Sequence, residues 1–309
     1  MNPTTYSTLE IHSDAINLLI GAVGVEGDVI KFRPLERFGE VLELSVEISR
    51  DNSICPDSIN KLETVLRRYG KLAHRNSGTV FVIATGAAAR TRNAPEVFAR
   101  LSTAAGETIH LMSDRRESAL AAGALLERMD TTGTQLLIDA GSSFTYVAVC
   151  EGRKILSDVL LPVGTTGLSA VLAGDPPGAL SWSLLASRVG FALHDLPHTL
   201  HAPGRAWATG SAAHNLVGLD RKEDQAADHL LCMPDLSSLA DELMAQPVRK
   251  VARRRGEDPR RIVLLPPGLV VVAAILDNYQ LSEATVVPEG LREGVIRAGV
   301  RNPASWWQG

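Results

Sequence analysis

One stretch of the chain places a carboxylate directly beside a turn of small polar residues. An apolar run, residues 136–138, ends in Asp139, and Gly141-Ser142-Ser143 follow before a second apolar run, residues 146–150. Backbone amides in a Gly/Ser turn can converge on a phosphate oxygen, and the carboxylate beside them can hold a metal or orient a water. An ordinary hairpin with an aspartate in its turn has the same pattern, so both interpretations stay open here.

The same order of residues occurs near the start of the chain. Residues 9–11 are apolar and include Glu10, residues 12–14 are polar and include Ser13, and residues 16–23 form a second apolar run. A repeat separated by about half the chain length indicates a duplicated architecture. We expect two similar α/β halves whose phosphate-binding turns face each other across one cleft.

Three further stretches combine a strand pattern, a turn of small residues and a helix. Residues 79–83 are an apolar run typical of a buried parallel strand, and small residues up to Gly86 precede a helix near Arg90. Residues 206–209 lead into Gly210-Ser211 in the same way, and Glu117 lies in the first turn of a helix that follows Ser113. A solvated helix face would equally explain Arg90, and a favourable interaction with the helix dipole would explain Glu117.

Other elements must hold these stretches in place. The sequence predicts strand structure at residues 30–49 and 108–111, helices at 57–74 and 115–129, and a strand, a Pro-Pro-Gly turn and a buried helix within 262–276. We expect a first domain over residues 1–128 and a second over 129–309, with the terminal helix free to pack back on the first. The dense basic run Lys250–Arg255 indicates a solvated helix face or a guide for a polyanion.

Composition excludes several classes of protein. The chain has 309 residues, of which 45% are hydrophobic and 21% charged, as in a globular protein of about two domains. A net charge of −4 gives no electrostatic footprint for nucleic acid, and three cysteines are too few for a disulfide framework or a zinc site. There is no signal-peptide pattern, and the apolar stretch 262–276 is too short to span a bilayer. We therefore expect a cytoplasmic protein with no membrane or nucleic-acid partner.

The order of these motifs is similar to that of a known family. The segment PEGLREGVI at residues 288–296 resembles a GLREG-type segment, and ATGAAARTRN at 84–93 resembles an ATSALRDARN-type stretch. Residues 106–123 resemble a segment with an SGEEEARL-like core, and residues 207–216 and 265–269 resemble later Gly-rich turns. By these motifs the chain resembles the exopolyphosphatase and guanosine-pentaphosphate phosphatase family. The resemblance implies an α/β fold of duplicated ribonuclease H-like type, as in actin, Hsp70 and sugar kinases, with two domains around a central cleft.

The resemblance also implies an activity and its residues. It implies metal-assisted hydrolysis of terminal phosphoanhydride bonds of inorganic polyphosphate or guanosine pentaphosphate, with Mg²⁺ or Mn²⁺, in a protein that forms a homodimer. Glu117 matches the second acid of the SGEEEA-type segment and would orient the attacking water, while Asp139 and Glu10 would contact the metal. Phosphate would be bound by Ser13, Arg90, Gly141, Ser142, Ser143, Gly210 and Ser211.

Several positions depart from the family pattern. Arg116 replaces the first acid of the SGEEEA-type segment, and Ser142 and Ser143 replace glycines of the second phosphate motif. His12 replaces a glycine and Asp14 an asparagine in the first motif, and Tyr146 replaces the glutamate that ends the second. A side chain at residue 12 lies where backbone must approach phosphate, and a tyrosine does not replace a carboxylate at neutral pH. Two alternatives therefore stay open: a non-catalytic member that binds a phosphorylated ligand or a protein partner, and a kinase-like transfer enzyme.

Overall fold

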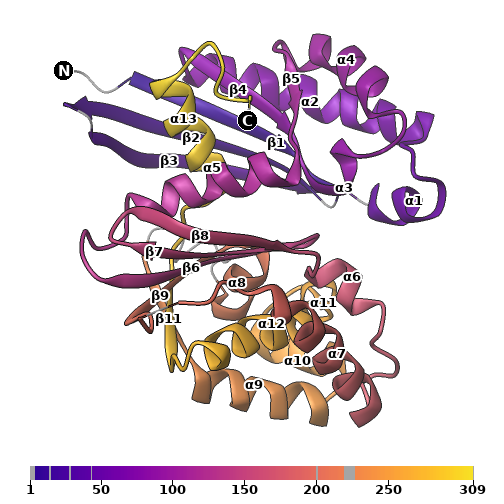
Figure 1. The fold of residues 1–309 in the computed structure, drawn as a ribbon. Helices are drawn as coiled ribbons and strands as arrows, with labels where there is room; N and C mark the ends of the chain where they lie inside the picture. Colours follow the sequence, from indigo (N-terminus) through magenta and orange to yellow (C-terminus); the bar gives the residue numbers. More distant parts are fainter. Residues whose placement is uncertain are drawn as a thin grey trace. The chain divides into compact units, whose positions relative to one another are not determined.

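The chain divides into two compact units. The computed structural model describes residues 4–13, 15–27, 29–42, 44–199, 201–218 and 227–308 (Figure 1). The first unit consists of the described residues up to Ala124 together with those from Leu291 on, and the second consists of those between Leu125 and Gly290. The sequence placed the boundary after residue 128 and left the position of the terminal helix open. In the structure that helix belongs to the first unit.

The first unit is built on a five-stranded sheet of order β3-β2-β1-β4-β5. Strands β1 to β3 form an antiparallel meander, and β4 and β5 run parallel to β1. The strands are β1 (Thr4–Ile11), β2 (Ala15–Glu26), β3 (Val29–Val41), β4 (Thr79–Ala84) and β5 (Ile109–Leu111). The predicted strand, polar turn and strand at the start of the chain are therefore the β1–β2 hairpin, in which Ile11 pairs with Ile16.

The second unit repeats this topology in its own sheet, of order β10-β11-β9-β6-β7-β8. Strands β6 to β8 form the antiparallel meander, β9 and β11 run parallel to β6, and β10 adds an antiparallel edge. The strands are β6 (Thr134–Ala140), β7 (Thr145–Glu151), β8 (Lys154–Leu161), β9 (Arg205–Thr209), β10 (His229–Cys232) and β11 (Glu283–Val286). Because the meander and both parallel strands recur in the same order, the predicted duplicated ribonuclease H-like α/β fold is confirmed.

Helices cover both faces of the first sheet. They are α1 (Leu44–Asp51), α2 (Pro56–Asn76), α3 (Gly86–Ala89), α4 (Ala94–Ala105), α5 (Asp114–Leu126) and α13 (Leu291–Arg301). Alternate residues of β4 serve the two faces: Val80 and Val82 join the core with α2 and α4, whereas Phe81 and Ile83 join the core with α13. The predicted apolar face of α2 is buried, but strand structure was wrongly expected at residues 44–49, which lie in α1.

The second unit has one large aliphatic core. Its helices are α6 (Thr165–Ser169), α7 (Ala179–Ala192), a 3-10 turn (Leu193–Asp195), α8 (Gly210–Val217), α9 (Met233–Ala245), α10 (Val248–Arg255), α11 (Pro259–Ile262) and α12 (Leu265–Asn278). The strand expected before Pro266-Pro267-Gly268 was wrong, because Ile262 ends α11, a turn follows, and Leu265 begins α12. Both prolines lie in the first turn of α12, where a missing amide hydrogen costs no helical hydrogen bond.

One described segment, Pro259–Asn278, is long and apolar enough to cross a membrane, with 20 residues and a mean hydropathy of 1.7. The stretch judged too short from the sequence, residues 262–276, is the central part of this longer helical segment. The core helix of a globular unit can have the same length and composition, and 56% of the apolar window is buried inside the protein. Val272, Ile275 and Leu276 of α12 are fully buried in the core of the second unit.

Close packing of α13 against α5 gives a testable prediction. A Cβ atom on Gly294 of α13 would lie 1.9 Å from the backbone oxygen of Leu120, so Gly294→Ala must displace backbone. We expect the substitution to lower the free energy of unfolding by at least about 2 kcal/mol, measured by urea unfolding. Gly123→Ala on α5 is the control, because nothing lies within 4 Å of its Cβ, and it should leave stability unchanged or slightly raised. Equal effects of the two substitutions would contradict this packing.

Candidate functional site

In the first unit, Glu117 contacts the turn that follows β4. Its Oε2 accepts a hydrogen bond of 3.2 Å from the backbone N–H of Gly86, and its side chain is half-buried. Gly86 has a φ of +57°, a conformation that favours glycine. The structure thus brings together two stretches that sequence analysis selected separately, the small residues after residue 83 and the first turn of α5.

Arg90 lies at the end of α3 and reaches the same helix. Its guanidinium forms an ion pair with Asp114, the first residue of α5. Both side chains are partly exposed, so solvent screens this attraction. A phosphate at Arg90 would therefore compete with a weakly held carboxylate three residues before Glu117.

Arg116, which replaces the first acid of the family's paired-acid segment, is directed toward the end of the chain. Its Nη2 donates a hydrogen bond to the backbone oxygen of Trp306. Burial lowers the pKa of Arg116 below its usual value. The guanidinium of Arg116 thus contacts the residues after α13. Glu117 is the one glutamate in the first turn of α5.

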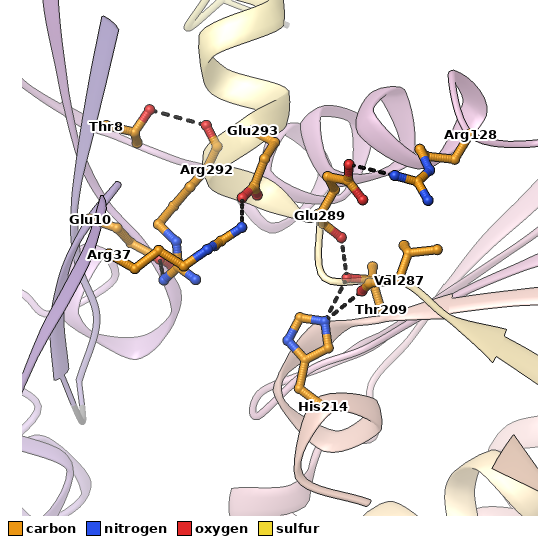
Figure 2. A network of polar contacts seen from close by, with 10 residues as sticks. All are labelled: Thr8, Glu10, Arg37, Arg128, Thr209, His214, Val287, Glu289, Arg292 and Glu293. Carbon is orange, nitrogen blue, oxygen red and sulfur yellow. Dashed lines mark hydrogen bonds and ion pairs between the residues drawn. The ribbon is translucent and has the colours of Figure 1, made fainter. Parts of the chain in front are cut away.

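Glu10, expected to be a metal ligand, is engaged by two other groups. Glu10 is only 9% exposed, and its Oε1 accepts a hydrogen bond of 3.2 Å from Thr85. Its Oε2 lies 3.1 Å from Arg292 (Figure 2). Thr8 in turn donates a hydrogen bond to the backbone oxygen of Arg292. A guanidinium already neutralises this carboxylate, so Glu10 does not fit a metal-binding role.

A second buried ion pair joins the same helix to β3. Glu293 is 1% exposed, and its Oε1 lies 2.7 Å from Arg37 Nη2 (Figure 2). Sequence analysis used Arg292 and Glu293 as markers of the family and gave them no role in the site. Their partners lie 282 and 256 residues away, and nothing in the spacing of the sequence identifies such pairs.

The β1–β2 turn holds the remaining expected residue of the first unit. Ser13 is buried, and its Oγ lies 3.3 Å from His12 Nδ1. The turn is closed by a hydrogen bond from the His12 amide to the backbone oxygen of Ala15, and the Leu44 amide donates to Ser13. Asp14, one of the departures from the family pattern, lies outside the described residues.

In the second unit, the β6–β7 turn is fixed by the start of α6. The amides of Thr165 and Thr166 donate to the backbone oxygens of Gly141 and Ser142, while the Gly141 amide donates to Phe144. These bonds occupy the Gly141 amide, which was expected to bind phosphate. Residue 164, directly before α6, must be glycine, because a Cβ there would lie 2.4 Å from the backbone oxygen of Ser142.

Asp139 lies at the carboxyl end of β6, between two neighbouring strands. It is 8% exposed, opposite Tyr146 of β7 in the antiparallel register and beside Thr209 of β9. Gly210 follows with a φ of +92°, and a Cβ there would lie 2.4 Å from Asp139 Oδ1. Only glycine allows this approach, so Asp139 and Gly210 are brought together, while Ser211 is exposed at the start of α8.

A polar network that sequence analysis missed supports Thr209. Its hydroxyl donates to the backbone oxygen of Glu289 at 2.7 Å and lies 3.3 Å from His214 Nε2, which lies 2.9 Å from the backbone oxygen of Val287 (Figure 2). Arg128 holds the carboxylate of Glu289 at 2.9 Å. The segment after β11 is thereby fixed to the strand end that carries Gly210.

Within the described part of the chain, no three His, Cys, Asp or Glu residues cluster as metal ligands. Mg²⁺ is commonly bound by one or two carboxylates together with substrate phosphates and water. Of the two acids expected to bind metal, Glu10 is paired with Arg292, and Asp139 lies at a strand end beside Gly210.

Comparison with known proteins gives the class of protein. A family model described as the Ppx/GppA phosphatase family matches residues 24–302, so the chain belongs to this family. Its fold is similar to the crystal structure of the Ppx/GppA family member of Aquifex aeolicus, with a TM-score of 0.83, 20% identity and coverage of 98% of this chain and 99% of the other. It is also similar to an exopolyphosphatase from Cytophaga hutchinsonii, with a TM-score of 0.82, 15% identity and the same coverage.

The buried pair in the first unit can be tested against an exposed one. Arg37→Ala leaves Glu293 without its guanidinium in a buried position, and we expect the free energy of unfolding to fall by about 3 kcal/mol. Arg100→Ala removes a similar partner from Glu63 on the surface and should cost less than about 1 kcal/mol. Urea unfolding measures the free energy of unfolding of both variants. A small effect of Arg37→Ala would show that the pair does not stabilise the first unit.

Proposed function

We propose that this chain hydrolyses terminal phosphoanhydride bonds of inorganic polyphosphate or guanosine pentaphosphate. Membership of a phosphatase family supports the class of reaction. The observation that carries the proposal is the contact between the carboxylate of Glu117 and the amide of Gly86. It holds an acid at the end of β4, at the position where the family resemblance expects the residue that orients water.

Phosphoanhydride hydrolysis depends on positioning a water in line with the phosphorus and on neutralising charge on the transferred group. In this proposal Glu117 accepts a proton from the attacking water, and the hydrogen bond from Gly86 fixes which carboxylate oxygen is presented. Arg90 leaves Asp114 to bind a substrate phosphate. The amides and hydroxyls of Ser142, Ser143 and Ser211 bind further phosphate oxygens.

A divalent ion, Mg²⁺ or Mn²⁺, belongs to the proposal through Asp139. When bound with substrate phosphates it would supply charge neutralisation. Glu10 has a different role here: its ion pair with Arg292 removes a negative charge from the first hairpin, which lowers its repulsion of a polyanion.

Specific contacts also favour a second candidate, a non-catalytic protein that binds a phosphorylated ligand. The Gly141 amide is used within its own turn, and the buried Tyr146 stands where the family has an acid. Both features weaken the second phosphate motif without affecting Glu117.

Phosphate release from long-chain polyphosphate and from guanosine pentaphosphate, with Mg²⁺ or Mn²⁺, separates the two candidates. We expect Glu117→Gln to lower kcat by at least about a hundredfold while substrate binding is retained, because a general base contributes about 10²–10⁴ in rate. The matched control is Glu96→Gln, which removes an exposed acid from the first turn of α4. If favourable helix-dipole interaction were the only role of such acids, both variants would behave alike.

Phosphate release by the wild-type protein provides a second test of the proposal. Absence of phosphate release from either substrate, together with retained binding of polyphosphate, would reject hydrolysis and favour the non-catalytic candidate. Release that is equal in wild type and Glu117→Gln would reject the role given to Glu117.

A further inference from the structure

The second unit contains a cavity that the proposed hydrolysis does not use. Its volume is about 360 Å³, and it lies between the ends of α6 and α9, the start of α10, helix α11 and the start of α12. Leu243, Ile262 and Pro266 are buried and form an apolar floor. Small-molecule sites generally have volumes of about 300–1,000 Å³ and mostly apolar linings with a few polar groups. The cavity therefore has the size and the floor of a site for a small organic molecule.

Gln246 supplies an unused polar group in the lining. It follows α9, and its Oε1 is buried without a hydrogen-bond partner in the described part of the chain. A buried acceptor that loses water without gaining a partner costs about 1–3 kcal/mol. Unsatisfied atoms of this kind are uncommon in folded proteins. A rotation of the Gln246 amide toward the cavity that this residue lines would let a ligand N–H or O–H satisfy the atom.

Arg249 supplies a charge at the rim. It is exposed at the start of α10 and forms no ion pair within the described residues. Arg260, the other arginine that lines the cavity, pairs with Asp258, and Arg254 and Arg255 of α10 pair with Glu242.

The acid at the same rim, Asp175, forms no ion pair with Arg249 within the described residues. Asp175 accepts a hydrogen bond of 2.6 Å from the Val248 amide at the start of α10. The dense basic run that sequence analysis could not assign thus contributes one uncommitted guanidinium to the mouth of an apolar cavity.

We propose that this cavity binds a small amphipathic anion, with its apolar body on the floor, an N–H or O–H donated to Gln246 and its anionic group at Arg249. A polyphosphate chain does not suit the cavity, because an apolar floor does not replace the water around its many charges. The ligand class is therefore different from the substrate proposed above, and the inference does not depend on the hydrolytic activity.

The probe for the test is 8-anilinonaphthalene-1-sulfonate, which combines apolar rings, one N–H and one sulfonate, and fluoresces more strongly in apolar surroundings. Titration of the full chain should show saturable binding. Arg249→Ala should raise the Kd about tenfold, because a hydrogen bond to a charged group contributes about 1.5 kcal/mol and 1.4 kcal/mol corresponds to a factor of ten. Val263→Trp, which fills the cavity from a rim position that is 39% exposed, should abolish saturable binding.

Two further variants sharpen the test. Gln246→Met keeps a side chain of similar size without the amide and should raise the Kd severalfold. Arg253→Ala, the matched control, removes an exposed cation from the same helix outside the cavity lining and should leave the Kd unchanged. Circular dichroism verifies that each variant is folded. If Val263→Trp is unfolded, the comparison of the Kd of Arg249→Ala with that of Arg253→Ala tests the proposal instead.

Two results would overturn the proposal. One is the absence of saturable fluorescence with the wild-type chain. The other is a Kd that Arg249→Ala and Val263→Trp leave unchanged, which would place the probe on another apolar surface, such as the exposed Leu180 and Phe191 of α7.

Discussion

Buried carboxylates must be paired, and in the first unit this requirement ties the end of the chain to its beginning. Arg292 neutralises Glu10 of β1, and Arg37 of β3 neutralises Glu293 of α13. Removing one partner from such a pair typically costs about 3–5 kcal/mol, more than a surface contact contributes. Helix α13 is thus held by its charges as well as by its apolar face, which explains why residues from Leu291 on join the first unit although 166 residues of the second unit, Leu125–Gly290, precede them.

In the second unit, the geometry around Asp139 depends on the close approach of atoms at two glycines. Glycines at 164 and 210 allow backbone and side-chain atoms to lie where any Cβ would collide. The turn after β6 is held by the amides at the start of α6, and the end of β9 is held through Thr209 by the segment after β11. The geometry around Asp139 therefore depends on elements distant in sequence, and changes at these glycines would disturb the acid without touching it.

The sequence predicted those parts of the fold that local patterns determine. Apolar runs on both sides of a small polar turn indicated both hairpins, and an apolar stripe indicated α2, because each signal is local in the sequence. Helix α1 was missed because its two turns are short, and a contact between Glu47 and Ser58 helps to hold it, which no local pattern contains. The strand expected before Pro266 was missed for a related reason: a short apolar run does not distinguish strand from buried helix.

The candidate site was predictable to a smaller extent. The small residues up to Gly86 and the acid at Glu117 were selected for their types, but only the fold places them 3.2 Å apart. The pairing of Glu10 with Arg292 was not predictable, because residue spacing carries no information about a partner 282 positions away. The sequence patterns therefore predicted one shared role for Glu10 and Asp139, binding of metal, although only Glu10 is paired with Arg292 in the first unit.

This difference shows how the two halves of a duplicated fold can diverge at equivalent positions. Glu10 and Asp139 are each the second-last residue of the first strand of their sheets, and each is followed by a turn into an antiparallel neighbour. In the first unit a guanidinium meets the carboxylate, so the hairpin carries less negative charge. In the second unit a glycine with positive φ approaches the carboxylate. Equivalent positions of the repeat thus carry an acid in different surroundings: one carboxylate is balanced by a cation from the end of the chain, and the other is enclosed by a close glycine.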